Sequence, residues 1–321
     1  RNRKKAAEGK MESKQSKSST LDRKMVKVGN TIEDPSKRKL RVLSWNVLAD
    51  KFCDDFPRVD DQYLKWEYRQ PLFLEELTRN PQDLICLCEV DHFGDFFEPM
   101  LKEKNFEGTF IKKDRHHDDG SALFFNTERF ELVMSEKDKY SGYVQLYIIN
   151  LLRDKASTEK NNLVLVATTH LKAKNTPENE EIRVAECAQL QEKMKSLSLN
   201  ATKLYIDESA TSGIIPMLIC GDFNSTPSGE VYSLMKESEL NLSSSYFNTF
   251  VSESEPKFTT QKIRRELTSH TIDYIWSSAN AFQTLEVLSI PTTAEIGNDA
   301  LPSKNYPSDH VAIAAVLQFS Q

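Results

Sequence analysis

The sequence contains no run of 18 apolar residues, so we expect no transmembrane helix. Cysteine is also scarce: the five cysteines are odd in number, and three of them fall inside apolar segments that predict buried strands. This usage favours a reduced intracellular protein over a disulfide-stabilised one. Cys86 and Cys88 have the spacing of neighbours on one face of a strand. No second Cys/His pair has zinc-site spacing, which favours core packing for both over a metal pair.

The composition is that of a globular protein. The chain has 321 residues, of which 39% are hydrophobic and 28% are charged, which is enough material for one large core or two small ones. We find no internal repeat and no second domain boundary, and therefore expect one domain over residues 40–321. A monomer is expected.

The net charge of −6 is unevenly distributed. Residues 1–39 hold thirteen lysines and arginines against five acidic residues, a balance of +8 that leaves −14 on the remaining chain. This segment is rich in lysine and serine, so we predict a disordered basic tail that tethers the domain or attracts anions weakly. The chain starts at Arg1 and not at Met, from which we expect a missing upstream segment. The expected location is the cytoplasm, or the mitochondrion if that segment carries a targeting signal.

From Leu40 onward, short apolar runs alternate with amphipathic segments, which is typical of a layered α/β domain. Four of these runs follow one another through short polar connections, so we predict that these neighbours pair antiparallel. Mixed β-sheets with outer helices are the fold class that fits. The predicted strands are 41–48, 83–90, 121–125, 130–134, 144–152, 163–169, 214–220, 272–276, 285–290 and 311–319. The predicted helices are 63–78, a segment beginning near residue 93, and 178–199, which precedes a linker at 204–213.

Polar residues stand where predicted strands end, and loops on a rigid sheet edge commonly carry catalytic groups. Asn46 ends the first strand and Glu89 ends the second. A hard cation such as Mg²⁺ takes oxygen ligands, so one carboxylate and one amide oxygen predict a metal site. Each residue alone has a simpler explanation, a turn for Asn46 and a helix cap for Glu89, but the pair favours the metal.

Asp222 and Asn224 follow another apolar run, after Gly221. If the strand alternation continues, both side chains point the same way, so that Asp222 positions or deprotonates a water and Asn224 donates to the same phosphoryl group. An Asx-turn leading into Pro227 explains the same residues equally well.

An aspartate and a histidine adjoin the last predicted strand. His310 is suited to donate to a phosphate oxygen if a carboxylate orients its charged ring, and the buried Asp273 is the better candidate for that carboxylate. Asp309 is then left to bind metal or water. An isolated Asp-His pair is usually structural, but a pair with a distant buried aspartate favours function. The whole set indicates a divalent-metal phosphoesterase.

The residue pattern resembles the endonuclease/exonuclease/phosphatase superfamily. Six motifs in order carry the likeness over residues 41–319, and the deadenylase-type branch is closest, within it the nocturnin group. The motifs for that branch include Trp45-Asn46, Leu64-Lys65-Trp66-Glu67-Tyr68-Arg69 and Asn305-Tyr306-Pro307-Ser308-Asp309-His310. The resemblance implies a DNase I-like sandwich of two β-sheets. It also implies Mg²⁺, with Mn²⁺ as an alternative, at Glu89 and Asn46; the implied catalytic residues are His170, Asp222, Asn224, Asp273, Asp309 and His310.

Three departures from the family pattern are visible. Cys88 and Ser121 replace a usual glutamine and cysteine, which we interpret as packing changes. Lys174 stands where nocturnins typically have arginine, which weakens planar bidentate phosphate recognition.

The nocturnin likeness implies a 2′-phosphatase acting on NADP⁺ and NADPH, whereas the wider branch implies a 3′-to-5′ poly(A) exoribonuclease. A polynucleotide needs a cationic path, and a domain at −14 offers little general attraction to RNA. We therefore hypothesise the dinucleotide and keep RNA and a non-catalytic interaction module as alternatives. The expected substrate-binding residues are Lys172, Lys174, Asn224, Arg264 and His270.

Overall fold

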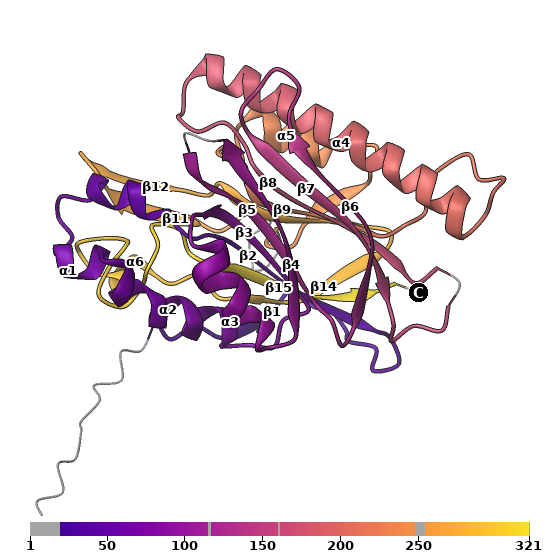
Figure 1. The fold of residues 1–321 in the computed structure, drawn as a ribbon, viewed down its shortest axis with the longest axis horizontal. Helices are drawn as coiled ribbons and strands as arrows, with labels where there is room; N and C mark the ends of the chain where they lie inside the picture. The colour runs from indigo at the N-terminus through magenta and orange to yellow at the C-terminus, as the bar shows by residue number, and fades with distance from the viewer. Residues whose placement is uncertain (1–19, 115–116, 160, 248–253, 321) are drawn as a thin grey trace, which may run out of the picture.

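The computed structural model describes residues 20–114, 117–159, 161–247 and 254–320. Two mixed β-sheets face each other, as predicted, and a small hairpin of β11 (Thr260–Ile263) and β12 (Leu267–His270) lies at one end (Figure 1). The first sheet runs, in spatial order, β1 (Met25–Lys27), β14 (Phe282–Leu288), β15 (Ile313–Phe319), β2 (Lys39–Asn46), β3 (Leu84–Val90), β5 (His117–Asn126) and β4 (Phe106–Asp114). The second runs β10 (Leu242–Ser244), β13 (Asp273–Ser278), β9 (Met217–Asp222), β8 (Leu163–His170), β7 (Leu146–Asp154) and β6 (Phe130–Lys139).

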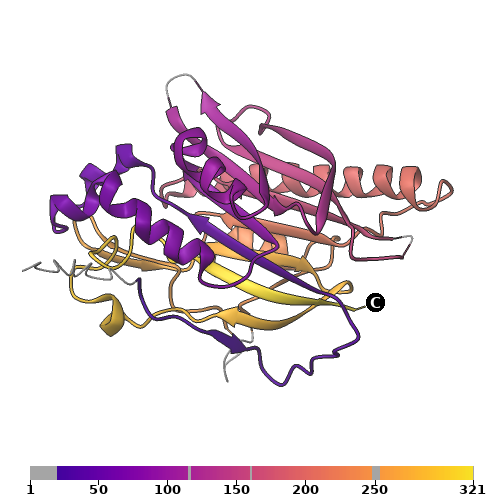
Figure 2. The same cartoon turned by 60° about the horizontal axis from the view of Figure 1, so that its bottom comes forward.

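Helices cover the outer faces of both sheets. The longest, α4 (Pro177–Tyr205), lies along the second sheet, and α2 (Trp66–Thr78) lies against the first (Figures 1 and 2). Thr176 starts α4 because its side chain accepts from the Asn179 amide and is followed by proline and two acidic residues. The remaining helices are η1 (Asp50–Asp55), α1 (Asp61–Leu64), η2 (Phe93–Phe97), α3 (Glu98–Lys102), α5 (Glu230–Lys236) and α6 (Thr293–Ile296).

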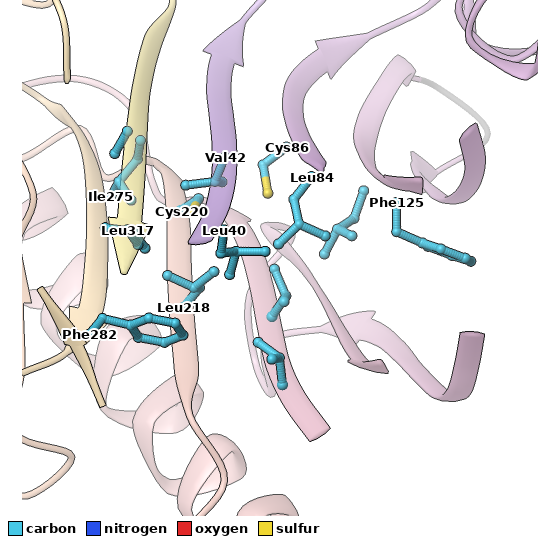
Figure 3. Packing of buried hydrophobic residues seen from close by; sticks show 14 of the residues in the cluster. Leu40, Val42, Leu84, Cys86, Phe125, Leu218, Cys220, Ile275, Phe282 and Leu317 are labelled. Carbon is cyan, nitrogen blue, oxygen red and sulfur yellow. The ribbon is translucent and has the colours of Figure 1, made fainter. Parts of the chain in front are cut away.

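The described residues form three large apolar layers. The central layer lies between the two sheets, where Leu40, Val42 and Leu84 of one sheet meet Leu218 and Cys220 of the other (Figure 3). One further layer packs the second sheet against α4 and α5, and another packs the first sheet against α2 and α3. The two sheets are therefore held rigidly face to face, with their strand ends aligned at common edges.

The predicted pairing of four consecutive strands is only partly right. β6, β7 and β8 pair antiparallel as predicted, but β5 lies in the other sheet, between β3 and β4. Phe125 and Phe130 flank the short connection from β5 to β6, and both enter the central layer. Because both rings are buried between the sheets, the chain crosses from the first sheet to the second at this connection. Strand β4 is absent from the predicted strands, because its side chains are mostly half-buried and form no apolar run.

The predicted boundary at residue 39 is also wrong for the described part of the tail. β1 pairs with β14, and the fully buried Arg23 guanidinium donates to Glu76, to Ser289 O and to Ala312 O. An arginine counted as solvated charge is thus part of the fold, because it binds a buried carboxylate and two main-chain carbonyls. Residues 1–19, the rest of the predicted tail, lie outside the described residues.

Other boundaries shift by a few residues. The predicted helix at 63–78 is two helices, because the extended backbone at Lys65 separates α1 from α2. Helix α4 continues to Tyr205, one turn and more beyond its predicted end. None of the helices in the described ranges is long and apolar enough to cross a bilayer.

Candidate active site

The predicted polar residues meet at one edge of the sandwich. Asn46 and His170 are the last residues of β2 and β8, and Asp222 is the last of β9. Asp273 begins the antiparallel β13 and lies opposite Asp222 in the strand register; His170 flanks Asp222 on the other side. This edge is the convergence of strand ends that the sequence predicts, and we refer to it as the catalytic rim.

Glu89 reaches the rim through a local irregularity of β3. It has a left-handed backbone (φ 57°) at the point where the register with β5 shifts. Its carboxylate accepts from Asn46 Nδ2 at 3.0 Å and from Ala49 N at 3.4 Å. Asn46 Nδ2 also donates to Asp222 Oδ2 at 3.0 Å, while Asn46 Oδ1 accepts from Leu48 N. Asn46 therefore faces the carboxylates with its nitrogen, and not with the amide oxygen expected of a metal ligand.

His310 is held by Asp273. Its Nδ1 lies 2.9 Å from Asp273 Oδ2, and the same oxygen accepts from Thr259 Oγ1 at 2.6 Å. The other ring nitrogen, Nε2, faces Asp222 Oδ2 at 3.8 Å. Burial alone would lower the pKa of His310, but Asp273, Asp309 and Asp222 together raise this pKa to about 9. The ring is thus a cation at neutral pH, as the sequence argument required.

His170 has the opposite ionisation. Its Nε2 lies 3.6 Å from Asp222 Oδ2 and 3.9 Å from Glu89 Oε1. Its Nδ1 is buried and has no hydrogen-bond partner in the described part of the chain. Burial lowers the pKa of His170 to about 4, against the opposing pull of Asp222. The ring is therefore neutral at pH 7.

Asp222 stands between the two histidines. Burial raises the pKa of its carboxyl, and the nearby Asp273 adds to that effect. The strand alternation predicted for Asp222 and Asn224 is wrong, because β9 ends at Asp222 and Asn224 is left-handed (φ 50°). Asn224 N donates to Asp222 Oδ1 at 2.9 Å, which is the Asx-turn alternative. Asn224 Nδ2 donates to Leu171 O.

The sequence argument left Asp309 to bind metal or water, but the structure pairs its carboxylate with cations. It accepts from Lys262 Nζ at 2.6 Å, and Arg264 approaches it to 3.8 Å. Burial would raise the pKa of Asp309, but Lys262 and His310 hold it well below its usual range. The hairpin β11–β12 thus brings two cations to the rim, of which only Arg264 was predicted to bind substrate.

The other predicted substrate residues are near rim residues in the sequence: two follow His170, and His270 precedes Asp273. Lys172 and Lys174 are on the loop that follows His170, one half-buried and the other exposed, and their contact with substrate stays a prediction. His270 is exposed and lines a cavity of about 620 Å³ with Lys236 and Phe247. A second cavity of about 610 Å³ borders Met217, at the opposite end of β9 from Asp222.

Sequence reasoning missed a buried acid beside His170. Asp119 is fully buried in β5, pairs with Lys113 at 2.6 Å and accepts from Lys51. Two of these residues are near enough to act on His170, because Lys113 lowers the pKa of that histidine and Asp119 raises it. The available signal was an acidic residue next to an apolar run, because Asp119-Gly120 precedes the apolar residues of β5.

The donor set of the rim fits a hard divalent cation. Glu89 presents carboxylate oxygens next to a neutral histidine and to Asp222, which is the oxygen chemistry that Mg²⁺ and Mn²⁺ prefer. Asp222, Asp273 and His310 also form a compact group with ligand atoms within 4.8 Å of one another. A cationic His310 opposes a metal there, so Glu89 is the better anchor.

Comparisons with known proteins identify the family. Residues 43–310 match the model of the Endonuclease/Exonuclease/phosphatase family. The chain is 38% identical over 302 residues to Nocturnin of Xenopus laevis, covering 88% of this chain and 74% of the frog protein. It is 24% identical to the CCR4-Not complex 3′-5′-exoribonuclease subunit Ccr4 of Neurospora crassa, over 89% of this chain and 46% of that protein. The structure of the human Nocturnin catalytic domain with bound sulfate superimposes with a TM-score of 0.72 at 33% identity, covering 93% of this chain and 97% of that one.

Proposed function

The chain belongs to the endonuclease/exonuclease/phosphatase family, and from this premise we propose that it is a metal-dependent phosphatase that removes the 2′-phosphate of NADP⁺ and NADPH. The products are NAD⁺ or NADH and inorganic phosphate. The observation that carries this proposal is the rim itself, where a cationic histidine, a neutral histidine and a buried carboxylate surround one point beside Glu89. Similarity to Nocturnin supports the choice of this family branch.

The chain's own residues supply most of the chemistry. His310, charged and held by Asp273, donates a hydrogen bond to a phosphoryl oxygen and stabilises the charge that develops there. Asp222 accepts the proton of the attacking water, helped by a pKa that burial has raised. Glu89, with Asn46 beside it, would hold a divalent cation, which would supply Lewis-acid stabilisation of the phosphoryl group.

Charge supports a small substrate. The basic groups at the rim are local and paired: Lys262 with Asp309, and Lys113 with Asp119. Residues 40–321 carry a net charge of −14. A dinucleotide needs only a small cationic pocket, whereas a polynucleotide needs an extended one.

Poly(A) exoribonuclease activity is the second candidate, and the similarity to the Neurospora exoribonuclease subunit favours it. The same rim would hydrolyse the terminal phosphodiester of RNA. Purified protein with Mg²⁺ is therefore given NADPH and an A-tailed RNA in parallel, with chelator controls. Phosphate release from NADPH supports the first proposal, and shortening of the RNA with NADPH untouched contradicts it.

Replacement of the metal anchor tests the mechanism. Glu89→Ala should reduce kcat/KM by roughly 10³-fold or more, because the metal contributes several kcal/mol to transition-state stabilisation, and added Mg²⁺ should restore little. Glu131→Ala is the matched control and should leave the rate unchanged. Glu131 lies on β6, and its exposed carboxylate pairs with Arg153 of β7. Wild-type activity in Glu89→Ala would exclude Glu89 as the anchor.

A further inference from the structure

Two loops carry groups toward the catalytic rim, and both rest on helix α4. The lysine loop, Leu171–Lys174, follows His170 at the end of β8, and the asparagine loop, Phe223–Gly229, follows Asp222 at the end of β9. Asn224 Nδ2 joins them by donating to Leu171 O at 3.0 Å. The chain of the asparagine loop also begins with the Asx-turn at Asp222. The positions of both loops therefore set where the predicted substrate-binding residues Lys172, Lys174 and Asn224 lie relative to the rim.

Arg183 of α4 holds the lysine loop by its main chain. The arginine is 1% exposed, and its Nη1 donates to Lys172 O at 2.8 Å and to Lys174 O at 2.9 Å. A third bond closes the loop from the same helix, because Lys172 N donates to the buried Glu186 Oε2 at 2.9 Å. Lys174 has a left-handed backbone (φ 76°), which a lysine rarely adopts. The bonds from Arg183 offset that strain.

Glu180 extends the same contacts to the asparagine loop. Its Oε2 accepts from Arg183 Nε at 2.6 Å, while its Oε1 accepts from Ser225 Oγ at 2.7 Å. A Cβ at Gly229 would lie 2.2 Å from Ser225 Oγ and 2.7 Å from Glu180 Oε1, so a larger residue there would displace the two bonded side chains. One oxygen of Glu180 thus binds the arginine and the other binds the loop that carries Asn224.

A buried ion pair is a weak means of stabilising a fold, because apolar side chains of similar volume often serve as well. An arginine forms fixed hydrogen bonds in several directions, which apolar packing cannot provide. In α4 these bonds go to the main chain of the loop with Lys172 and Lys174 and, through Glu180, to the loop with Asn224. The arrangement suits a device that fixes loop geometry.

We propose that Arg183 is a positioning residue, which acts with Glu180 and Glu186 to hold the lysine loop and the asparagine loop in register, so that their side chains meet one phosphorylated substrate together. This inference rests on the proposed phosphoesterase function. It does not depend on which phosphate ester is hydrolysed, because both loops border the same rim.

The test compares Arg183→Met, which keeps volume and removes every donor, with Arg183→Lys, which can reach one carbonyl. Arg183→Met should raise KM for NADPH about tenfold and lower kcat/KM by about 10- to 100-fold, since a displacement of about 1 Å in positioning groups has effects of this size. Arg183→Lys should restore part of the loss. Lys195→Met, an exposed change on the same helix, is the matched control and should behave as wild type.

Ser225→Ala keeps the proposal testable if Arg183→Met does not fold. It removes only the hydroxyl bonded to Glu180 and should lower kcat/KM by several-fold without changing the melting temperature by more than a few degrees. A folded Arg183→Met or Ser225→Ala with wild-type KM and kcat would overturn the inference. If wild type leaves NADPH intact and hydrolyses another ester, the proposed substrate fails, and the same variants measured on that ester still decide the inference.

Discussion

His310 and His170 both face Asp222 and differ in the charged groups that surround each ring. Both are buried, at 3% and 6% exposure, and their Nε2 atoms face the same Asp222 oxygen at 3.8 Å and 3.6 Å. The pKa of His310 is nevertheless raised to about 9, whereas that of His170 is lowered to about 4.

The partner of Nδ1 is the first cause of this difference in pKa. In His310 it meets the Asp273 carboxylate at 2.9 Å, and in His170 it meets no hydrogen-bond partner within the residues described. Burial lowers the pKa of both rings, and only three nearby carboxylates around His310 overcome it. The same residue type, at the same depth, therefore becomes a cation on one side and a neutral ring on the other. Paired groups with pKa values pushed apart are the usual basis of acid–base assignments.

The strongest test of this difference is removal of the charge. His310→Gln keeps a donor near the position of Nε2 but cannot be cationic, so phosphate release should fall roughly 10³-fold, the cost of losing a charged donor at the developing negative charge. The measurement is steady-state kcat on the ester that wild type hydrolyses, with melting temperature as the check on folding. A loss of tenfold or less would show that the charge on His310 is unimportant.

A second test uses stability against pH, measured by denaturant unfolding in a chelator so that no metal intervenes. The folded-state pKa of His310 is raised above its ordinary value of 6.5, so its stabilisation is full below pH 6.5 and is lost as pH rises through about 9. The folded-state pKa of His170 is lowered, so stability is lost as pH falls from 6.5 through about 4. Each effect is at most about 3 kcal/mol.

Replacing each histidine should separate the acid-side loss of unfolding free energy from the alkaline-side loss. His310→Gln should flatten the loss of unfolding free energy on the alkaline side, and His170→Gln should flatten the loss on the acid side. Glu131→Gln, at an exposed position, should leave both limbs as in wild type. If His310→Gln instead flattened the loss on the acid side, or His170→Gln the loss on the alkaline side, the two charge states would be assigned the wrong way round.

The convergence of strand ends was predictable because each catalytic candidate follows or precedes an apolar run that forms a strand. Asn46, His170 and Asp222 lie within two residues of the ends of the predicted strands, and they are the last residues of β2, β8 and β9. The bond between Asp273 and His310 was also predictable, since a carboxylate between Ile272 and Tyr274 requires a partner.

What the sequence could not supply depends on contacts between distant segments. The sequence predicts that Asp309 is available to bind metal or water, but the hairpin pairs it with Lys262. It also predicts a solvated Arg23, but the segment that leads into β1 pairs this arginine with Glu76. The amide orientation of Asn46 is set by Leu48 and the facing acids together. Local periodicity contains no information on such encounters, which explains why the strands were found more reliably than the partners of charged side chains.

The smallest expected effect comes from the neutral side of the rim. His170→Gln retains a neutral donor beside Asp222 and removes no charge, so kcat should fall only about tenfold, the size of one neutral hydrogen bond, and the ratio to His310→Gln should be near 10². Steady-state rates of both variants, measured at pH 7 on one substrate, give that ratio directly. A His170→Gln loss as large as that of His310→Gln would mean that the neutral ring moves a proton during the reaction, and the two sides of Asp222 would then be partners in one transfer and not a charged donor opposite a neutral one.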